Sequence, residues 1–397
     1  MTEKLGVRHA ILAVVLAGAL VTFGGVSLFV AFFVIVPMAQ TLFRAAGIPG
    51  RLIPAAVSLG TSTFTMSALP GTPSIQNAIP MPFFGTSPFA APWLGLIASA
   101  IMLGFGLWWL GLKATAARKA SEGYGNSADT DPKVAAADPL VRERASTSRD
   151  FDPAEIGHGA IAATLPPIWR AAIPLAVVVA VNVLMSLVIL PRVDASFRAL
   201  PEWGETSLAG VGGVWSVIAA LLAGIASLLL LSHDRLPGLR QTMDAGANAS
   251  VRPAMAVASF VGFGAVVAAL PAFAAVSDWV LTIGGGPLVS LAVAVNILAA
   301  LTGSPSGGLT IALDALGATY MALAADLGIS PELLHRVAVI SAGTLDSLPH
   351  NGAVVTLLAV CGMRHGDSYV DLAIDSIGGA MLALIAVIGL GTMFGTF

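Results

Sequence analysis

The chain has 397 residues, of which 56% are hydrophobic and 10% are charged, and its mean hydropathy is +0.88. A water-soluble fold does not need so much apolar surface, so we expect a polytopic, all-α membrane protein. The net charge of -3 argues against a nucleic-acid partner, because a phosphate-binding surface needs an excess of clustered Lys and Arg. The single cysteine, Cys361, excludes an internal disulfide and any metal site built from several cysteines.

Apolar segments recur along the whole chain at lengths that suit a bilayer, whose core calls for roughly 20 apolar residues per spanning helix. The first segment follows Lys4 and Arg8 but lacks a small-residue cleavage pattern, so we interpret it as a retained membrane segment. The expected segments are 9–23, 26–43, 52–80, 92–112, 168–190, 209–231, 253–275, 287–302, 309–325, 335–362 and 371–393.

Two pairs of these segments are joined too tightly to be ordinary spans with a solvated loop between them. Only Gly24 and Gly25 separate the first pair, and only GSPSGG at 303–308 separates 287–302 from 309–325. Each pair predicts a re-entrant hairpin whose tip stops inside the membrane.

Two further segments contain helix breakers, LPGTPS at 69–74 and LPHNG at 348–352, and predict discontinuous helices. From Gly24 to Leu69 and from Gly303 to Leu348 the chain advances by the same 45 positions. Hairpin, break and spacing together indicate an internal repeat with an offset of 279 positions.

The distribution of charge predicts that the repeat is inverted. The polar stretch 113–167 contains many Lys and Arg residues, which places it in the cytoplasm, and the intervening spans then give the two hairpins opposite orientations. We expect a first transmembrane repeat at 1–112, a flexible cytoplasmic linker at 113–167 and a second transmembrane repeat at 168–397. A phosphorylation or docking site in the linker is the alternative to a plain tether.

Three stretches carry a resemblance to a known family: FTMSALPGTPSIQNAIPMPFFGT at 64–86, GSPSGGLTIALDALG at 303–317 and SAGTLDSLPHNGAVVTLLAVCG at 341–362. They resemble the gluconate permease (GntP) family of the ion transporter superfamily. The resemblance implies proton-coupled uptake of small hydroxy- or keto-carboxylates, such as gluconate or 3-hydroxybutyrate, through a bacterial inner membrane. Three spans precede the second hairpin and none precedes the first, so we also expect roughly three N-terminal helices to be absent from this chain.

The discontinuous helices and hairpin tips predict the substrate site. A helix that restarts at mid-membrane presents unpaired N–H groups and a positive dipole end, which attract an anion. No Lys or Arg lies in a tip or a break, so we expect the two breaks to bind one carboxylate through backbone amides and polar side chains. The alternative is that the hydroxyl groups only satisfy freed carbonyls. The candidates are Ser27, Thr72, Ser74, Gln76 and Asn77 in the first half, and Ser304, Ser306, Thr310, Ser347, His350 and Asn351 in the second.

Asp346 is the candidate for proton coupling, because the repeat has Ser67 at the corresponding position and an ionised carboxylate is costly at depth. His350, four positions later, is expected to share or relay the proton or to donate to the substrate. Asp314 is the second carboxylate considered, and the alternative role of Asp346 is to cap the helix that restarts beyond the break. For the remaining membrane-flanking histidines we expect solvation at span ends: His9, His158, His233, His335 and His365.

Other functions remain open at this stage. A sodium-coupled carboxylate carrier or an exchanger shares the same architecture, and a channel is a third option. An intramembrane hydrolase with a Ser306–His350 dyad is disfavoured because the repeat has Gly71 where the second half has His350. The partners expected are therefore the lipid bilayer, a small carboxylate and protons, with no cofactor; a homo-oligomer is left open.

Overall fold

This computed structural model describes residues 9–125, 166–195, 208–235, 238–268 and 282–396, with a few isolated residues between these ranges. Within the described residues the chain is helical and contains no β-strand. The expected all-α fold of a polytopic membrane protein is confirmed. The helices long and apolar enough to cross a membrane are Leu28–Ala46, Pro92–Lys119, Trp169–Arg192, Val211–Arg235, Pro305–Leu327 and His365–Phe394.

Large apolar side chains cover the outside of these helices. Leu222 and Ile385 are each 61% exposed, and Leu230 is 79% exposed. A water-soluble protein would bury such side chains, whereas a surface in contact with lipid favours them. The outer face of the helix assembly is therefore suited to hydrocarbon.

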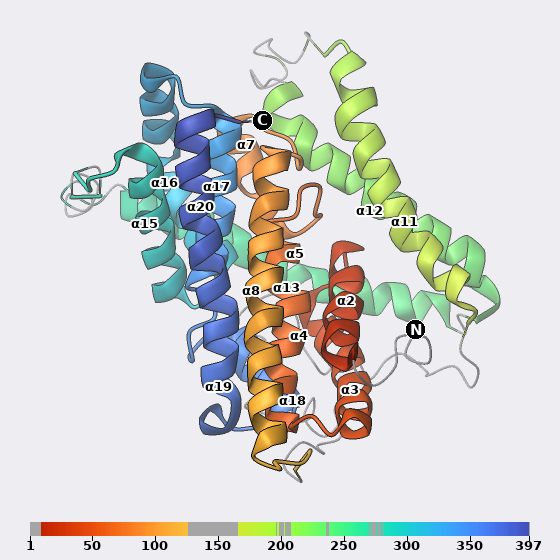
Figure 1. Ribbon diagram of the computed structural model, residues 1–397. Coiled ribbons are helices and arrows are strands. Elements are labelled where there is room, and N and C mark those ends of the chain that lie inside the picture. The colour runs from red at the N-terminus through yellow and green to blue at the C-terminus, as the bar shows by residue number, and fades with distance from the viewer. Residues whose placement is uncertain are drawn as a thin grey trace.

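The first half consists of a helix hairpin, an interrupted helix and one long helix (Figure 1). Pro92 begins the long helix at a position where its missing N–H costs nothing, and Arg118 and Lys119 lie in its last turn, where they complement the negative helix end. In chain order the elements are α2 (Ala10–Phe23), α3 (Leu28–Ala46), η2 (Gly50–Leu52), α4 (Ile53–Thr61), α5 (Phe64–Ser67), α6 (Ile75–Ala78), α7 (Pro80–Phe84) and α8 (Pro92–Lys119).

The second half repeats this order after three additional helices. The expected segment 253–275 belongs to a helix that begins earlier, at Leu239, and ends at Ala268. The elements are α11 (Ile168–Leu184), η4 (Met185–Ile189), η5 (Leu190–Arg192), α12 (Leu208–Ser232), η8 (His233–Arg235), α13 (Leu239–Ala268), α15 (Gly286–Thr302), α16 (Pro305–Leu327), α17 (Pro331–Thr344), α18 (Gly352–Val360), α19 (His365–Ala373), η9 (Ile374–Gly378) and α20 (Gly379–Phe394).

Both predicted hairpins turn at a glycine with a positive φ angle. Gly25 has φ 91°, and Gly303, between α15 and α16, has φ 60°. These angles strain residues that carry a Cβ, so glycine lets each chain reverse within a few residues. Each hairpin combines one short apolar helix with one long enough to cross a membrane. That the tips stop inside the membrane stays a prediction.

The two halves exchange contacts in a reciprocal way. Each hairpin packs on the interrupted helix of its own half, α2 and α3 on α4, and α15 and α16 on α17. The second arm of each hairpin also contacts the restarted helix of the other half, α3 with α18, and α16 with α6 and α7. Helix α8, the last of the first half, runs beside η9 and α20, the last elements of the second half (Figure 1). Two units related by a two-fold axis would pack in this way, although their inverted orientation in a membrane stays a prediction.

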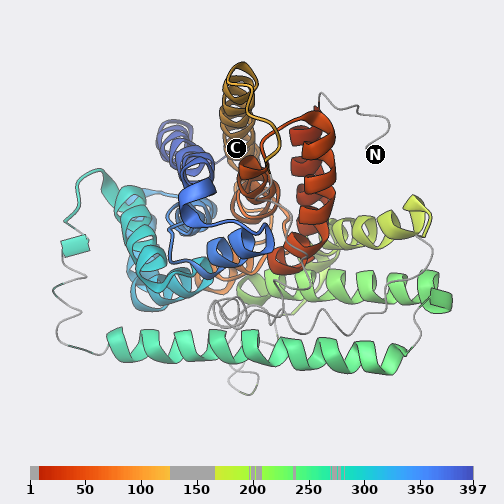
Figure 2. The same ribbon diagram turned by 90° about the horizontal axis from the view of Figure 1, so that it is seen from below.

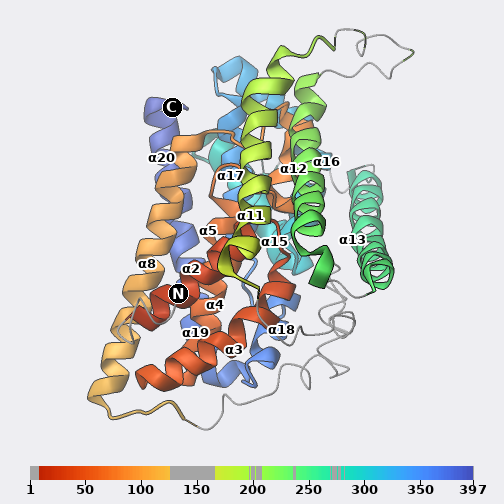
Figure 3. The same ribbon diagram turned by 90° about the vertical axis from the view of Figure 1, so that its right-hand side faces the viewer.

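The helices between the halves lie at the periphery. Helices α11 and α12 pack together, and α12 contacts α7 (Figure 3). Helix α13 lies along one edge of the assembly (Figure 2) and packs on α16. Helix α8 continues to Lys119, into the range expected for the linker, and residues 126–165 of that range lie outside the described residues.

Candidate functional site

Asn351 joins the second hairpin tip to the second break. Its Oδ1 accepts a hydrogen bond of 2.7 Å from the Ala353 N–H at the start of α18. Its Nδ2 donates to the Gly303 carbonyl at the tip, at 2.8 Å, and to Oδ1 of Asp346. Because α16 begins directly after this tip, the positive ends of α16 and α18 lie next to each other.

Asp346 lies on a narrow cavity between the two halves. The cavity is lined by Asp346, Ser347 and Asn351 of the second break and by Ser58 and Ser62, which lie in and directly after α4. Asp346 is half-buried. Asn351 occupies the N-cap position of α18, so the cap that we considered as an alternative role for Asp346 is supplied by its neighbour. Asp346 therefore lines the cavity and accepts a hydrogen bond from Asn351 instead of capping α18.

The hydroxyl groups at the start of α16 are buried and hydrogen-bonded within the helix end. Ser304 caps α16 by accepting from the Gly307 N–H at 3.2 Å, and its Oγ lies 3.2 Å from Oγ of Ser306. Thr310 donates to the Ser306 carbonyl at 2.8 Å. Thr310 thus satisfies a backbone carbonyl, whereas Ser304 and Ser306 form a hydroxyl pair beside the tip.

His350 is exposed, and its Nε2 lies 2.9 Å from the Ala300 carbonyl. Since only an N–H can donate to a carbonyl, this nitrogen carries a proton. The Ser306 hydroxyl pairs with Ser304 rather than with His350. The arrangement lacks the serine–histidine hydrogen bond that a hydrolytic dyad requires.

The first break differs because the side chain of Asn77 is hydrogen-bonded within the protein on both its nitrogen and its oxygen. Asn77 is 0% exposed, and its Nδ2 donates to the carbonyls of Thr72 and Pro88, both at 3.0 Å. Its Oδ1 lies 3.1 Å from Nε2 of His335, whose Nδ1 lies 2.6 Å from Oγ1 of Thr86. The expectation that His335 is solvated at a span end is wrong: it is fully buried and attaches α17 to the segment after the first break.

Arg336, the next residue of α17, is also fully buried. Its guanidinium group donates to the Ala68 carbonyl at 3.1 Å, directly after α5, and twice to the Ala90 carbonyl. Although no Arg lies within a break, this one lies against the first break from the other half. Sequence reasoning missed it, and the available signal was a His-Arg pair inside an otherwise apolar segment.

The other first-half candidates lie around this locked segment. Ser74 caps α6 and donates to the Met66 carbonyl at 2.7 Å, and Thr72 is buried beside it. Gln76 is buried, and its Oε1 has no hydrogen-bond partner. Ser27 precedes α3 and is exposed, with no side-chain cap hydrogen bond.

The contacts thus divide the candidate residues into two groups, each beside its own hairpin tip. Asp346, His350 and Asn351 gather at Gly303, whereas a Cβ at Gly25 would lie 3.6 Å from Cγ of Pro73 in the first break. A single site shared by both breaks stays a prediction. Asp314 lies half-buried within α16.

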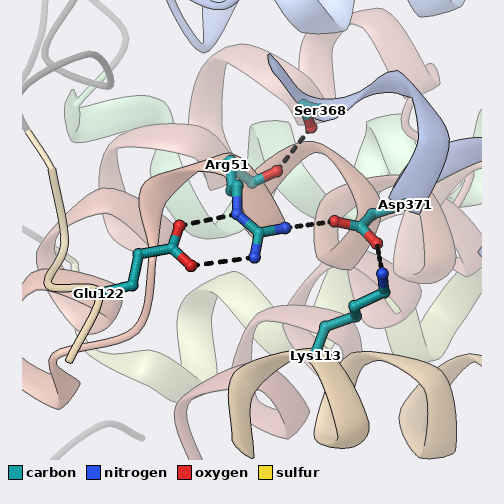
Figure 4. A network of polar contacts seen from close by, with 5 residues as sticks. All are labelled: Arg51, Lys113, Glu122, Ser368 and Asp371. Atoms are coloured by element: carbon teal, nitrogen blue, oxygen red, sulfur yellow. Dashed lines mark hydrogen bonds and ion pairs between the residues drawn. The ribbon is translucent and has the colours of Figure 1, made fainter. Parts of the chain in front are cut away.

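A charged network that the sequence reasoning also missed connects the two halves (Figure 4). Arg51 of η2 donates to both carboxylate oxygens of Glu122, at 2.8 and 3.1 Å, and pairs with Asp371 of α19. Lys113 of α8 lies 3.4 Å from the same aspartate, and Ser368 donates to the Arg51 carbonyl at 2.6 Å. The hydrogen bonds from Arg51 lower the pKa of Glu122 below its ordinary value. Only the folded chain brings these residues together, so no local motif could have revealed them.

Comparison with known proteins identifies one informative relative. None of the known protein-family profiles matches this chain. The chain is 39% identical, over 398 residues, to a Bacillus subtilis (strain 168) protein named uncharacterized transporter YxjC. The match covers 98% of this chain and 80% of the relative.

Proposed function

This chain belongs to the same family as the Bacillus subtilis transporter, and we propose that it is a secondary active transporter that carries small organic anions together with protons. The observation that carries the proposal is the junction at Asn351. There a hairpin tip, the start of α18 and the carboxylate of Asp346 meet beside a cavity between the two halves. Hairpins that close on interrupted helices suit alternating access.

The proposed substrate is a small hydroxy- or keto-carboxylate such as gluconate or 3-hydroxybutyrate, as the resemblance of the three motifs to the gluconate permease family implies. Its carboxylate would bind at the adjacent starts of α16 and α18, where backbone N–H groups and the positive helix ends favour negative charge. The hydroxyl pair of Ser304 and Ser306 and the amide of Asn351 supply further polar groups at this place.

Asp346 provides a physical reason for coupling to protons. An ionised Asp346 next to a bound carboxylate would place two negative charges within a few ångströms in a poorly hydrated cavity, which is strongly unfavourable. Protonation of Asp346 removes this repulsion, so substrate and proton bind together and cross together. His350 lies at the same junction and is proposed to pass the proton to or from Asp346. We further propose that this transport takes place in the bacterial inner membrane.

Transport measurements on the purified chain in proteoliposomes test the proposal. A pH gradient should drive accumulation of labelled gluconate or 3-hydroxybutyrate. Asp346→Asn should abolish this accumulation yet leave exchange of labelled for unlabelled substrate largely intact. Asp326→Asn, which removes an exposed carboxylate at the end of α16, is the matched control.

Three outcomes would contradict this assignment. If Asp346→Asn still accumulates substrate when only a pH gradient is imposed, Asp346 is not the coupling residue. If a sodium gradient drives accumulation and a pH gradient does not, the chain is a sodium-coupled carrier; if neither does and exchange persists, it is an exchanger.

A further inference from the structure

A second buried carboxyl group lies in the last membrane-crossing helix, away from the junction at Asn351. Asp375 is 1% exposed, and neither Oδ1 nor Oδ2 has a hydrogen-bond partner. An ionised carboxylate that loses its water without gaining a partner is strongly destabilising. A structure that keeps such a group must either use it or neutralise it.

Asp375 occupies an irregular turn of the helix. Residues Ile374–Gly378 form a π-helical turn, η9, between α19 and α20. Such wide turns are uncommon within helices and are frequent at functional sites. Asp375 lies ten residues into the span His365–Phe394, one helical turn further along it than Asp371 of the charged network.

The neighbouring helix α8 leaves room for this carboxyl group because the residue beside it, Gly106, has no side chain. A Cβ on Gly106 of α8 would overlap Oδ1 of Asp375 and would come within 2.6 Å of the methyl carbons of Leu59. Alanine would be the better helix former at this position, so the glycine is best explained by the space that Asp375 occupies. The carboxyl is therefore enclosed by α8 and α4 rather than by water.

The charged groups around Asp375 are engaged elsewhere. Of the elements packed against η9, α4 and α20 contain no charged residue. Helix α8 carries Lys113 and, in its exposed last turn, Arg118 and Lys119, and α19 carries His365, Asp367 and Asp371. His365 and Asp367 are exposed, and they contact the Pro349 carbonyl and the Arg364 N–H. Lys113 and Arg51 both pair with Asp371, as Figure 4 shows. Asp375 is thus left without a counter-ion, one helical turn from another carboxylate.

A proton is the ligand that fits these surroundings. A sodium ion would need several oxygen atoms that converge on it, but the nearby hydroxyls of Ser58 and Ser376 bond to each other, at 3.0 Å. A proton needs no coordination shell and removes the charge outright. Ser58 also lines the cavity that contains Asp346, so its pair with Ser376 connects that cavity to the residue next to Asp375.

We propose that Asp375 is a proton-binding site of the transport cycle, distinct from Asp346 of the second break. The proton arrives from water in the Asp346 cavity, binds a carboxylate oxygen of Asp375, and is later released to water at higher pH. This inference rests on the proposed function only for the use of the proton in transport, because binding of the proton can be measured without any substrate.

Infrared spectroscopy of the purified protein tests the proton site directly. At neutral pH the wild-type protein and the control Asp326→Asn should show the C=O stretching band of a protonated carboxylic acid, and Asp375→Asn should lose it. Asp346→Asn should keep this component of the band. An unchanged band in Asp375→Asn would overturn the proposal.

A second measurement needs no variant. A carbodiimide that reacts with protonated carboxyl groups in apolar surroundings should modify wild-type Asp375, as detected by peptide mass spectrometry, and the modification should decrease as the pH rises. Modification that is absent, or that does not depend on pH, would also overturn the proposal.

Transport measurements then distinguish the proton site at Asp375 from the proposed transport function. Asp375→Asn should retain exchange of gluconate or 3-hydroxybutyrate and lose most of the accumulation driven by a pH gradient, and full accumulation would remove Asp375 from the transport cycle. If the wild-type protein exchanges neither substrate, the proposed function fails, while the infrared band still decides whether Asp375 binds a proton.

Discussion

The two breaks share their position in the repeat but differ in how their polar groups are used. In the first break, Asn77 makes three hydrogen-bond contacts and is fully buried, because His335 and the carbonyls of Thr72 and Pro88 surround it. In the second break, Asn351 also makes three contacts, but it shares them with a half-buried carboxylate on a cavity. Asn351 is itself only 2% exposed, so the two breaks differ in the half-buried Asp346 beside Asn351 and not in the burial of the asparagine.

The difference originates in α17, the interrupted helix of the second half. At the repeat positions of His335 and Arg336, α4 has Ala56 and Val57. Helix α17 therefore clamps the first break with two polar side chains, whereas α4 has apolar residues at the equivalent positions and contributes Ser58 to the cavity at the second break. The two halves can thus share the order of their helices while the polar groups of their breaks have different partners.

Removal of the clamp should have the largest effect. Arg336→Met keeps the apolar stem but leaves the Ala68 and Ala90 carbonyls without their charged donor, so the free energy of unfolding should fall by about 3 kcal/mol or more. Thermal unfolding in detergent measures the loss. The exposed Arg118→Met is the control, and an unfolding temperature equal to that of the control would show that the first break is not locked by Arg336.

We expect substitutions in the two hairpins to change stability by more similar amounts than substitutions in the two breaks. A Cβ on Gly308 would overlap the backbone of Ala299 in the second hairpin, and a Cβ on Gly60 would overlap the Val15 backbone where the first hairpin packs on α4. Alanine at either position should destabilise the protein by roughly 1–3 kcal/mol through overpacking. Gly104→Ala, which meets open space, should have little effect. A large loss in only one of the two variants would extend the asymmetry from the breaks to the hairpins.

Measurements of substrate affinity provide a further test of the difference between the two breaks. Asn351→Ala should weaken binding of gluconate or 3-hydroxybutyrate by roughly 1–3 kcal/mol, because it removes a polar group at the junction. Asn77→Ala should reduce thermal stability and leave the affinity of the remaining folded protein unchanged. Thr72→Val distinguishes one shared site from a site at the second break alone. Equal affinity of this variant and the wild type, by isothermal titration, assigns the ligand to the second break.

Much of the fold could be predicted because it depends on local signals. Apolar runs, the glycine tips and the proline-containing breaks each act over a few residues, and the structure confirms the interrupted helices and the tight turns at Gly25 and Gly303. The end of α8 was less predictable, because its last turns carry Lys and Arg that are typical both of helix ends and of solvated linkers.

The functional side chains were harder to predict because the fold decides which hydrogen-bond partners each of them has. Asn77 and Asn351 occupy similar sequence contexts beside proline breaks, and nothing local shows that one faces His335 and the other Asp346. Asp375 was missed because a single acid in an apolar segment gives no indication of its partners. Its lack of any partner became evident only when α4, α8 and α20 were placed around it.

The smallest expected effect concerns the ion pairs that attach α19 of the second half to the first half. Helix α19 follows the second break, and Arg51 attaches it to the first half through Asp371 while binding Glu122 (Figure 4). Because the pKa of Glu122 is lower in the folded protein than in the unfolded chain, its contribution to stability is present at neutral pH and is lost as the pH falls below about 4.

Thermal unfolding of wild-type protein and Glu122→Gln measures this contribution. The wild type should be slightly more stable at pH 7, by a small amount because Glu122 is 40% exposed and water screens the pair. The difference should shrink as the pH falls below the ordinary pKa of a glutamate, roughly 4.3, and should vanish once Glu122 of the folded protein is protonated as well. High salt should reduce the difference at neutral pH. A difference that stays constant with pH would mean that Glu122 acts through packing rather than charge. The electrostatic attachment of α19 would then depend on the pairs that Asp371 makes with Arg51 and Lys113.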